Sequence, residues 1–197
     1  MKITADTFHT MVEENPSVFE HWDTPLEISG FVNCEGSPIT HLSPHLIFSG
    51  TPDGEAANFA KCPNLKIATG TFQGWTNFGE SGVEEIKDLH ITYTHLGTMA
   101  AATFAGCKSL KIATGTYAGG VTFYESGIHS IHNLDIQAPN VNGFYTDFTD
   151  SPNLHSLKGW DLSKKFTIEP EKLAAEKERL ALLKHKKENQ LIELPFL

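Results

Sequence analysis

An internal duplication constrains the fold of this chain more than any other feature of its sequence. Residues 57–91 align with residues 102–136 without a gap, and 19 of the 35 aligned positions are identical. The segment LKIATGT occurs letter for letter at 65–71 and again at 110–116. Identity of this extent at a fixed offset of 45 residues indicates a copied structural unit, so we expect a repeat architecture.

A shorter period lies inside the copied unit. Leucines that open a Leu-x-Ile triplet, or a triplet similar to it, recur at 26, 46, 65, 89, 110, 134 and 154, in steps of 19 to 24 residues. Such a triplet places a central residue between two apolar ones, which is the period of a half-buried strand. We therefore expect one short strand per step, with successive strands paired in parallel about 4.8 Å apart. Both apolar residues of each triplet should point inward, with the upstream Phe, Val and Ile filling the returning side. Gly70 and Gly115 should let the chain bend after the strand.

Two motifs resemble a known repeat family. NFAKCPNL at 58–65 and TFAGCKSL at 103–110 look like the F-x-x-C-x-x-L core of the BspA-like subgroup of leucine-rich repeats, and LEISGFVNCEGSPITHLSPHLIFSGT is more similar to shorter bacterial repeats. The resemblance covers roughly residues 24–160. The sequence departs from the common LxxLxLxxN pattern of leucine-rich repeats in that its asparagine is missing. The leucine spacing and the internal duplication, together with this resemblance, predict an α/β solenoid, a leucine-rich-repeat-like right-handed coil of about seven turns with a short parallel β-sheet.

The N-terminal segment 1–23 is expected to cap the repeat region at 24–165. A helix over about 4–14 begins at a capping Thr4 or Asp6 and ends at Asn15-Pro16. A cap is needed because the first turn of a repeat array exposes an unpaired edge and an uncovered core. The apolar stripe of this helix consists of Phe8, Met11 and Val12.

The C-terminal segment 166–197 gives the strongest helix signal in the chain. Pro170 suits a first helical turn, and Ala, Leu, Glu and Lys dominate the residues that follow. Three roles remain open for this helix: covering the last turn, pairing with a second copy to form a homo-oligomer, and docking into a partner protein.

Composition excludes several classes of function. The net charge is −9, and Arg179 is the single arginine. Nucleic-acid binding requires a clustered basic surface, so we expect no nucleic-acid partner. No stretch approaches the about 20 apolar residues of a membrane span, and no apolar signal-peptide region is visible near the start. We expect no membrane partner and a cytoplasmic protein, with non-classical secretion as the alternative. The odd cysteine count fits free thiols.

The candidate chemical motifs favour a surface or core role over catalysis. His129 and His132 should lie on the outer face, and no third ligand accompanies them, so we expect no metal site and no cofactor. Cys62 and Cys107 should occupy equivalent buried slots two turns apart, about 10 Å from each other and beyond disulfide reach. The repeated Glu-Ser-Gly at 80–82 and 125–127 is expected to form a turn, since no histidine recurs beside it. The segment EHWD at 20–23 is a candidate site, but its assignment to the N-terminal cap is preferred.

One recurring surface follows from the triplets. Their middle residues should form an outward row along the strands: Glu27, Ile47, Lys66, His90, Lys111, Asp135 and His155. A second row is expected at Ala68, Thr92, Ala113 and Gln137. Solenoids bind proteins through such faces because regular spacing gives a wide contact. Aromatic and polar residues in the adjoining loops suit an adaptable contact.

We therefore expect a non-catalytic module that binds another protein, in the setting of a bacterial or phage inhibitor or effector. Two alternatives are a structural subunit that oligomerises through the C-terminal helix and a small carbohydrate-active enzyme on a β-solenoid, with Asp147 and Asp150 as its carboxylates. The expected partner-binding residues are Lys66, His90, Lys111, Asp135, His155, Tyr93, Phe144 and Tyr145.

Overall fold

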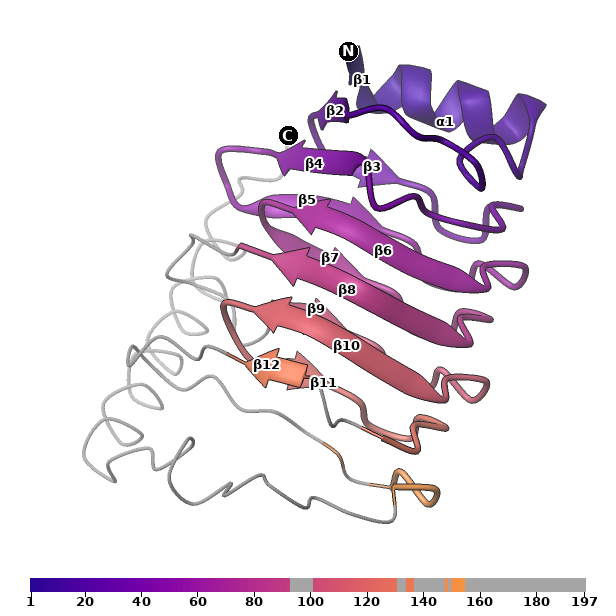
Figure 1. Cartoon of the computed structure of the whole chain (residues 1–197), viewed down its shortest axis with the longest axis vertical. Coiled ribbons are helices and arrows are strands. Elements are labelled where there is room, and N and C mark those ends of the chain that lie inside the picture. The colour runs from indigo at the N-terminus through magenta and orange to yellow at the C-terminus, as the bar shows by residue number, and fades with distance from the viewer. Residues whose placement is uncertain (93–100, 131–133, 137–147, 149, 155–197) are drawn as a thin grey trace, which may run out of the picture.

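The computed structural model describes residues 1–92, 101–130, 134–136, 148 and 150–154. This part of the chain consists of two parallel β-sheets and one short α-helix (Figure 1). The seven-stranded sheet has the order β1-β2-β4-β6-β8-β10-β12, and the five-stranded sheet has the order β11-β9-β7-β5-β3. The returning side of the chain, where we expected apolar residues to fill the core but predicted no strands, is itself a parallel sheet.

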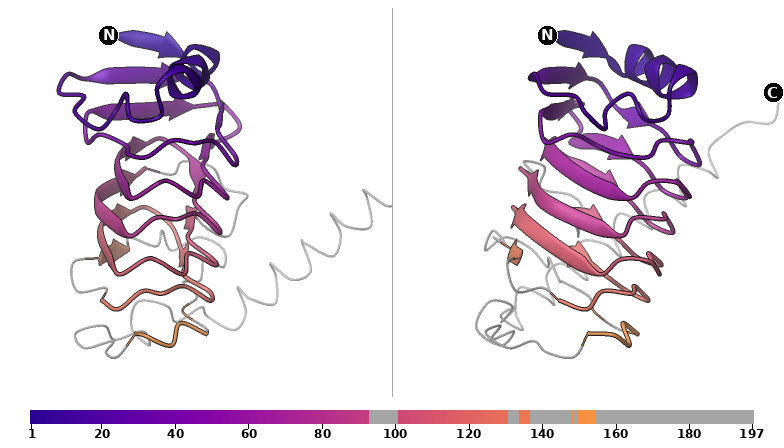
Figure 2. Two further views of the ribbon diagram at one scale, coloured as in Figure 1. Left: turned by 90° about the vertical axis from the view of Figure 1, so that its right-hand side faces the viewer. Right: turned by 45° about the vertical axis from the view of Figure 1, so that its right-hand side comes forward.

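From β2 onward the chain alternates between the two sheets. We call one strand of the seven-stranded sheet, the next strand of the five-stranded sheet and the turn after it a layer. Figure 2 shows the layers stacked along the long axis of the molecule. The 45-residue duplication thus corresponds to two layers. The elements are β1 (Lys2–Thr4), α1 (Ala5–Glu14), β2 (Leu26–Ser29), β3 (Val32–Asn33), β4 (Leu46–Gly50), β5 (Glu55–Asn58), β6 (Ile67–Phe72), β7 (Trp75–Asn77), β8 (Glu85–Ile91), β9 (Ala102–Thr103), β10 (Ile112–Tyr117), β11 (Val121–Thr122) and β12 (Leu134–Ile136).

A column of phenylalanines runs through the core beside the five-stranded sheet. Its neighbouring rings are stacked with centroids 5.2 to 5.6 Å apart and interplanar angles of 3 to 16°. Stacked aromatic pairs add stabilisation beyond the apolar area that they bury. The column contains Phe59, Phe78, Phe104, Phe123 and Phe148.

The register of the seven-stranded sheet differs from the one expected from the leucine spacing. Leu26 lies opposite Leu46, but Leu89 lies opposite Gly70 on one side and Gly115 on the other. The two glycines therefore occupy the leucine slot within β6 and β10, and the expectation that they follow the strand is wrong. Each has a positive φ, +114° and +129°, which favours glycine.

Leu65 and Leu110 precede their strands and belong to the turns. Both are fully buried, but Ile67 is only half-buried and Ile112 is 45% exposed, so their triplets do not bury both apolar residues completely. Ala68 and Ala113, expected on the outside, are buried instead. The strict alternation of inward and outward residues is interrupted here, because the alanine after each isoleucine points into the core in its place.

A left-handed residue recurs in each turn after the phenylalanine column. The amide of this residue donates to a carbonyl of the following layer in four cases, for example Lys61 N to Gly79 O at 2.8 Å. The residue after it is a serine or cysteine whose side chain points into the core. The left-handed positions are Gly36, Lys61, Glu80, Gly106, Glu125 and Asp150.

The side chains of these turns form a column in which serine and cysteine alternate from Ser37 to Ser126, and a second serine, Ser151, follows. Cys62 Sγ donates to the carbonyl of Cys34 at 3.0 Å, and Cys107 Sγ donates to the carbonyl of Phe78 at 3.0 Å. The Ser81 hydroxyl lies 3.6 Å from Cys107 Sγ. The expected burial of the thiols is confirmed, and the Glu-Ser-Gly segment provides the serine of the same column. The column contains Ser37, Cys62, Ser81, Cys107, Ser126 and Ser151.

The expected N-terminal helix is present with nearly the predicted bounds. Helix α1 begins after Thr4, whose hydroxyl accepts from the Thr7 amide at 3.2 Å, and it ends at Asn15. Phe8 and Val12 are fully buried. The ring of Phe8 stacks on Phe19 at 4.6 Å and meets Phe59 edge-on at 6.3 Å, so α1 covers the first layer, where Cys34 replaces the phenylalanine. Strand β1 was not expected; it pairs with β2 and forms the edge of the seven-stranded sheet.

The expected C-terminal helix at 166–197 lies outside the described residues. Helix α1 is the one helix in the part of the chain that the structure describes. Within that same part, no helix has the length and apolar character needed to cross a bilayer.

Candidate recognition surface

Lys66 and Lys111 flank a single carboxylate on the outside of the seven-stranded sheet. Backbone hydrogen bonds of 2.9 Å join Glu84 N to Lys66 O and Lys111 N to Glu84 O, so the three residues stand in consecutive layers. Lys66 Nζ lies 2.7 Å from Glu84 Oε1, and Lys111 Nζ lies 3.6 Å from Glu84 Oε2. The hydrogen bond from Lys66 is the main reason why the pKa of Glu84 is lowered. The three side chains remain solvent-exposed, so this charge ladder is available to a partner.

Two isoleucines lie next to the charge ladder. Ile67 and Ile112 are both register partners of Glu85, one on each side. Ile112 is among the few large apolar residues that the described part of the chain exposes. The duplicated Lys-Ile pair is therefore presented twice, two layers or about 10 Å apart, with Glu84 and Glu85 between the copies.

His90 and Asp135 belong to a different row from the two lysines. The ladder places His90 opposite Thr71 and Thr116, and places Thr116 opposite Asp135. The expected single row with Lys66 and Lys111 is therefore wrong, because the lysines precede β6 and β10 by one residue. The row that contains His90 consists of Lys2, Glu27, Ile47, Thr71, His90, Thr116 and Asp135.

A β-bulge separates the two rows. Lys87 and Asp88 in β8 together oppose Thr114 in β10. Asp88 has φ +44°, and its amide donates to the Thr114 hydroxyl at 2.8 Å. The bulge adds two charged side chains to the surface between the charge ladder and the His90 row.

Most of the remaining residues expected at the site lie outside the described part of the chain. Tyr93, Phe144, Tyr145 and His155 lie outside the described residues, as do Gln137 and the candidate carboxylate Asp147. Thr92 is exposed at the end of β8. Glu84 and Glu85 were missed by the sequence analysis. The sequence feature that could have identified them is that this acidic pair stands where the second copy has His129 and Ser130. The pairing of consecutive layers, which the sequence does not show, places Glu84 beside the two lysines.

The candidate catalytic and metal-ligating residues form no reactive group in the described part of the chain. No set of three or more His, Cys, Asp or Glu side chains lies close enough there to hold a metal ion. His129 is exposed, as expected, and His132 lies outside the described residues. Burial raises the pKa of the Cys107 thiol to about 11, which keeps it protonated and unreactive at neutral pH. Asp150 occupies the left-handed turn position.

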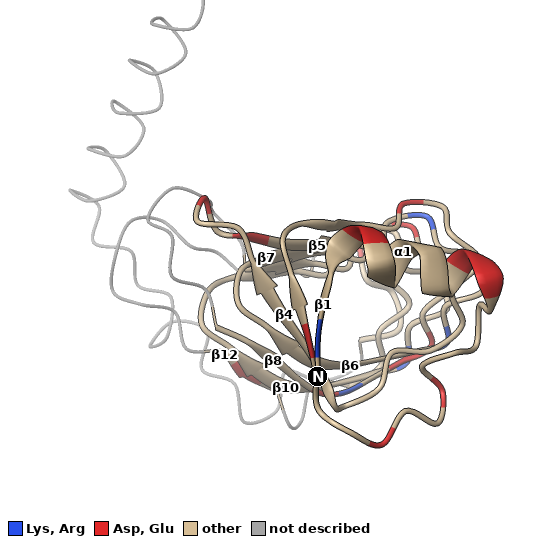
Figure 3. Cartoon of the chain, turned by 90° about the horizontal axis from the view of Figure 1, so that it is seen from above, with Lys and Arg blue, Asp and Glu red and all other residues tan. Residues whose placement is uncertain are grey.

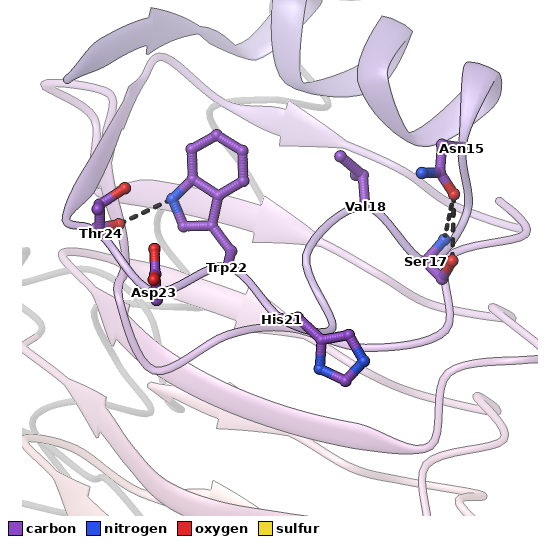
Figure 4. Close-up of a pocket in the computed structure, with 7 residues that line it drawn as sticks. All are labelled: Asn15, Ser17, Val18, His21, Trp22, Asp23 and Thr24. Atoms are coloured by element: carbon purple, nitrogen blue, oxygen red, sulfur yellow. Dashed lines mark hydrogen bonds between the residues drawn. The ribbon is translucent and has the colours of Figure 1, made fainter.

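A second feature is a surface pocket of about 420 Å³ beside helix α1 (Figure 4). It is formed by the segment between α1 and β2, including three residues of the EHWD motif that was assigned to the cap. The side chains that line it are Asn15, Ser17, Val18, His21, Trp22, Asp23 and Thr24.

The chain was compared with protein-family models, with curated proteins and with solved structures. None of the three comparisons found a match.

Proposed function

We propose that the chain is a leucine-rich-repeat-like solenoid, a right-handed coil of about seven turns, which binds another protein and catalyses no reaction. The alternation of strands between two parallel sheets in sequence order supports the solenoid. So does the burial of the phenylalanine, cysteine and leucine of both F-x-x-C-x-x-L motifs. The binding surface is the outside of the seven-stranded sheet.

The observation that carries the proposal is the repeated Lys-Ile pair around Glu84 and Glu85. An incompletely buried isoleucine beside a lysine offers an apolar contact with a charged rim, the composition of many non-obligate interfaces. The lysines are partly neutralised by Glu84, so a partner carboxylate competes with Glu84 for Lys66 and Lys111. Such rim charges chiefly set association rate and specificity.

Two double variants test the surface. Lys66→Glu with Lys111→Glu reverses both charges beside Glu84. Lys61→Glu with Lys108→Glu reverses two lysines that are similarly exposed and similarly paired, to Glu35 at 2.8 Å and Glu125 at 3.1 Å, but that lie in the turns. Each tagged protein is used for affinity capture from the native cell followed by mass spectrometry, and the captured partner is then purified and titrated.

The expected result is a partner that binds the wild-type chain and the turn variant with similar affinity. Its affinity for the Lys66/Lys111 variant should fall at least about tenfold, which corresponds to about 1.4 kcal/mol. Equal affinity for both variants would show that the partner uses another surface. Thermal unfolding of both variants checks that neither has lost its fold.

A further inference from the structure

The pocket beside α1 carries an inference that is independent of the sheet surface. Its backbone is held by hydrogen bonds to the next layer: Ser43 Oγ donates to the carbonyl of Trp22 at 2.6 Å, and Thr40 N donates to the carbonyl of Pro16 at 3.0 Å. Asn15 Oδ1 accepts from both the amide and the hydroxyl of Ser17, at 3.2 and 3.1 Å. A pocket fixed in this way loses little conformational entropy when a ligand binds.

The indole of Trp22 is oriented before any ligand arrives. Its Nε1 donates to the carbonyl of Thr24 at 2.8 Å, and its ring meets the buried ring of Phe19 edge-on, with centroids 5.7 Å apart. Trp22 is half-buried and lines the pocket (Figure 4). Because the N–H is already used, the indole offers a ligand its π face, and a cation is the ligand group that this face attracts most strongly.

The charge around the pocket favours a cation as well. No lysine or arginine occurs between Lys2 and Lys61, while nine carboxylates do. Two of the nine, Glu27 and Glu35, pair with those flanking lysines. Figure 3 shows acidic residues on α1 and on the segments beside it. The nine are Asp6, Glu13, Glu14, Glu20, Asp23, Glu27, Glu35, Asp53 and Glu55.

The carboxylates closest in sequence to the pocket pair with no lysine or arginine of the described chain. Glu13 and Glu20 face histidines, His9 at 3.7 Å and His41 at 3.8 Å, and Asp23 makes no ion pair with any described residue. Their summed field makes the N-terminal end negative and raises the local concentration of a basic ligand.

We propose that this pocket binds an arginine side chain in a basic segment of a partner protein. The guanidinium stacks on the π face of Trp22 and pairs with the carboxylate of Asp23. Arginine suits the site better than lysine because its planar group both stacks on aromatic rings and forms two parallel hydrogen bonds with one carboxylate. The aliphatic stem of the arginine, three methylenes long, finds apolar contact at Val18, which lines the pocket.

Fluorescence anisotropy of a labelled alanine-based peptide with two arginines tests the proposal on the full chain. The wild-type chain should bind this peptide, and Asp23→Asn should weaken binding by about tenfold, because a charge-assisted pair is lost. The matched control is Asp53→Asn. This residue is also an exposed aspartate, in the turn between β4 and β5, and its replacement should change the affinity less than about twofold.

Three outcomes would overturn the proposal. The first is no binding of the arginine peptide to the wild-type chain. The second is equal weakening in Asp23→Asn and Asp53→Asn, which would assign the attraction to net charge. The third is equal affinity for the matched lysine peptide, which would remove the guanidinium preference. Trp22→Leu should also weaken binding. If Trp22→Leu unfolds, the comparison of Asp23→Asn with Asp53→Asn still tests the proposal.

Discussion

Gly115 lies directly opposite Leu89 in the ladder between β8 and β10, in a slot that the neighbouring strands fill with leucine. A Cβ added to Gly115 would overlap the carbonyl oxygen of Leu89 and lie within 2.6 Å of its amide nitrogen. Both atoms are backbone, so neither can move aside without breaking the ladder. The glycine of LKIATGT is therefore repeated because it allows the backbones of two adjacent layers to approach each other closely.

Replacing Gly115 with alanine should destabilise the chain by about 3 kcal/mol or more, since it combines this overlap with a φ of +129° that alanine avoids. Gly36→Ala is the control, because Gly36 also has a positive φ but no atom within 4 Å of an added Cβ. Its cost should be about 1 kcal/mol. Urea unfolding of the two variants gives the comparison. Equal costs would mean that left-handed strain alone, and not the close approach, explains the glycine.

The sequence predicted the parallel pairing and the cap but not the register. Leu65-Lys66-Ile67 and Leu89-His90-Ile91 have the same local pattern, yet the first triplet begins in a turn and the second lies within a strand. A period of two identifies which residues alternate but not which residue of one layer faces which residue of the next. The bulge at Lys87 and Asp88 adds one residue to β8, which shifts the register. Because Leu89 faces a glycine and not another leucine, the leucine spacing alone does not reveal which residues are paired.

Tyr117→Phe should stabilise the chain by about 1 kcal/mol. Tyr117 is fully buried, and its hydroxyl has no hydrogen-bond partner within the described structure. Removing an unpaired buried polar group removes its desolvation penalty. Phe72 occupies the aligned position of the first copy, so Phe72→Tyr is the reciprocal test and should lower stability. Denaturant midpoints measure both. A loss of stability in Tyr117→Phe would reveal a partner for the hydroxyl.

Phe104→Ala should cost about 3 to 5 kcal/mol, because Phe104 stacks on Phe78 and Phe123 at 5.2 Å on each side. Ile112→Ala, at an exposed position in β10, should cost less than about 1 kcal/mol. Thermal unfolding monitored by circular dichroism distinguishes the two. A small loss in Phe104→Ala would indicate that adjacent layers collapse into the space, so that the column is not the principal source of stability.

The candidate surface was predictable in composition but not in arrangement. Lys66 and Lys111 were recognised because they recur in the duplicated heptapeptide. Their shared partner Glu84 lies 18 residues after the first and 27 before the second, and no local pattern joins residues at those separations. The EHWD segment that contains Trp22 was considered as a site, but the cap was preferred for a related reason: the pocket backbone is positioned by Thr40 and Ser43, which belong to the next layer.

The buried thiols should make the chain less stable in alkaline solution. Burial raises the pKa of Cys34 to about 12 and that of Cys107 to about 11, above the value of 9.0 for an unperturbed thiol. Above pH 9 the unfolded chain loses these protons while the folded chain keeps them, so the unfolded state binds fewer protons and the free energy of unfolding falls as pH rises. Between pH 9 and 11 the slope of the unfolding free energy should be about −1.4 kcal/mol per pH unit for each thiol.

Urea titrations at several pH values measure this slope for the wild-type chain and for Cys107→Ser, in which the hydroxyl keeps a donor toward the carbonyl of Phe78. The serine variant should show a shallower slope, and the wild-type thiols should react with iodoacetamide at pH 8 only after unfolding. Rapid alkylation of the folded chain would contradict the burial on which the serine and cysteine column depends.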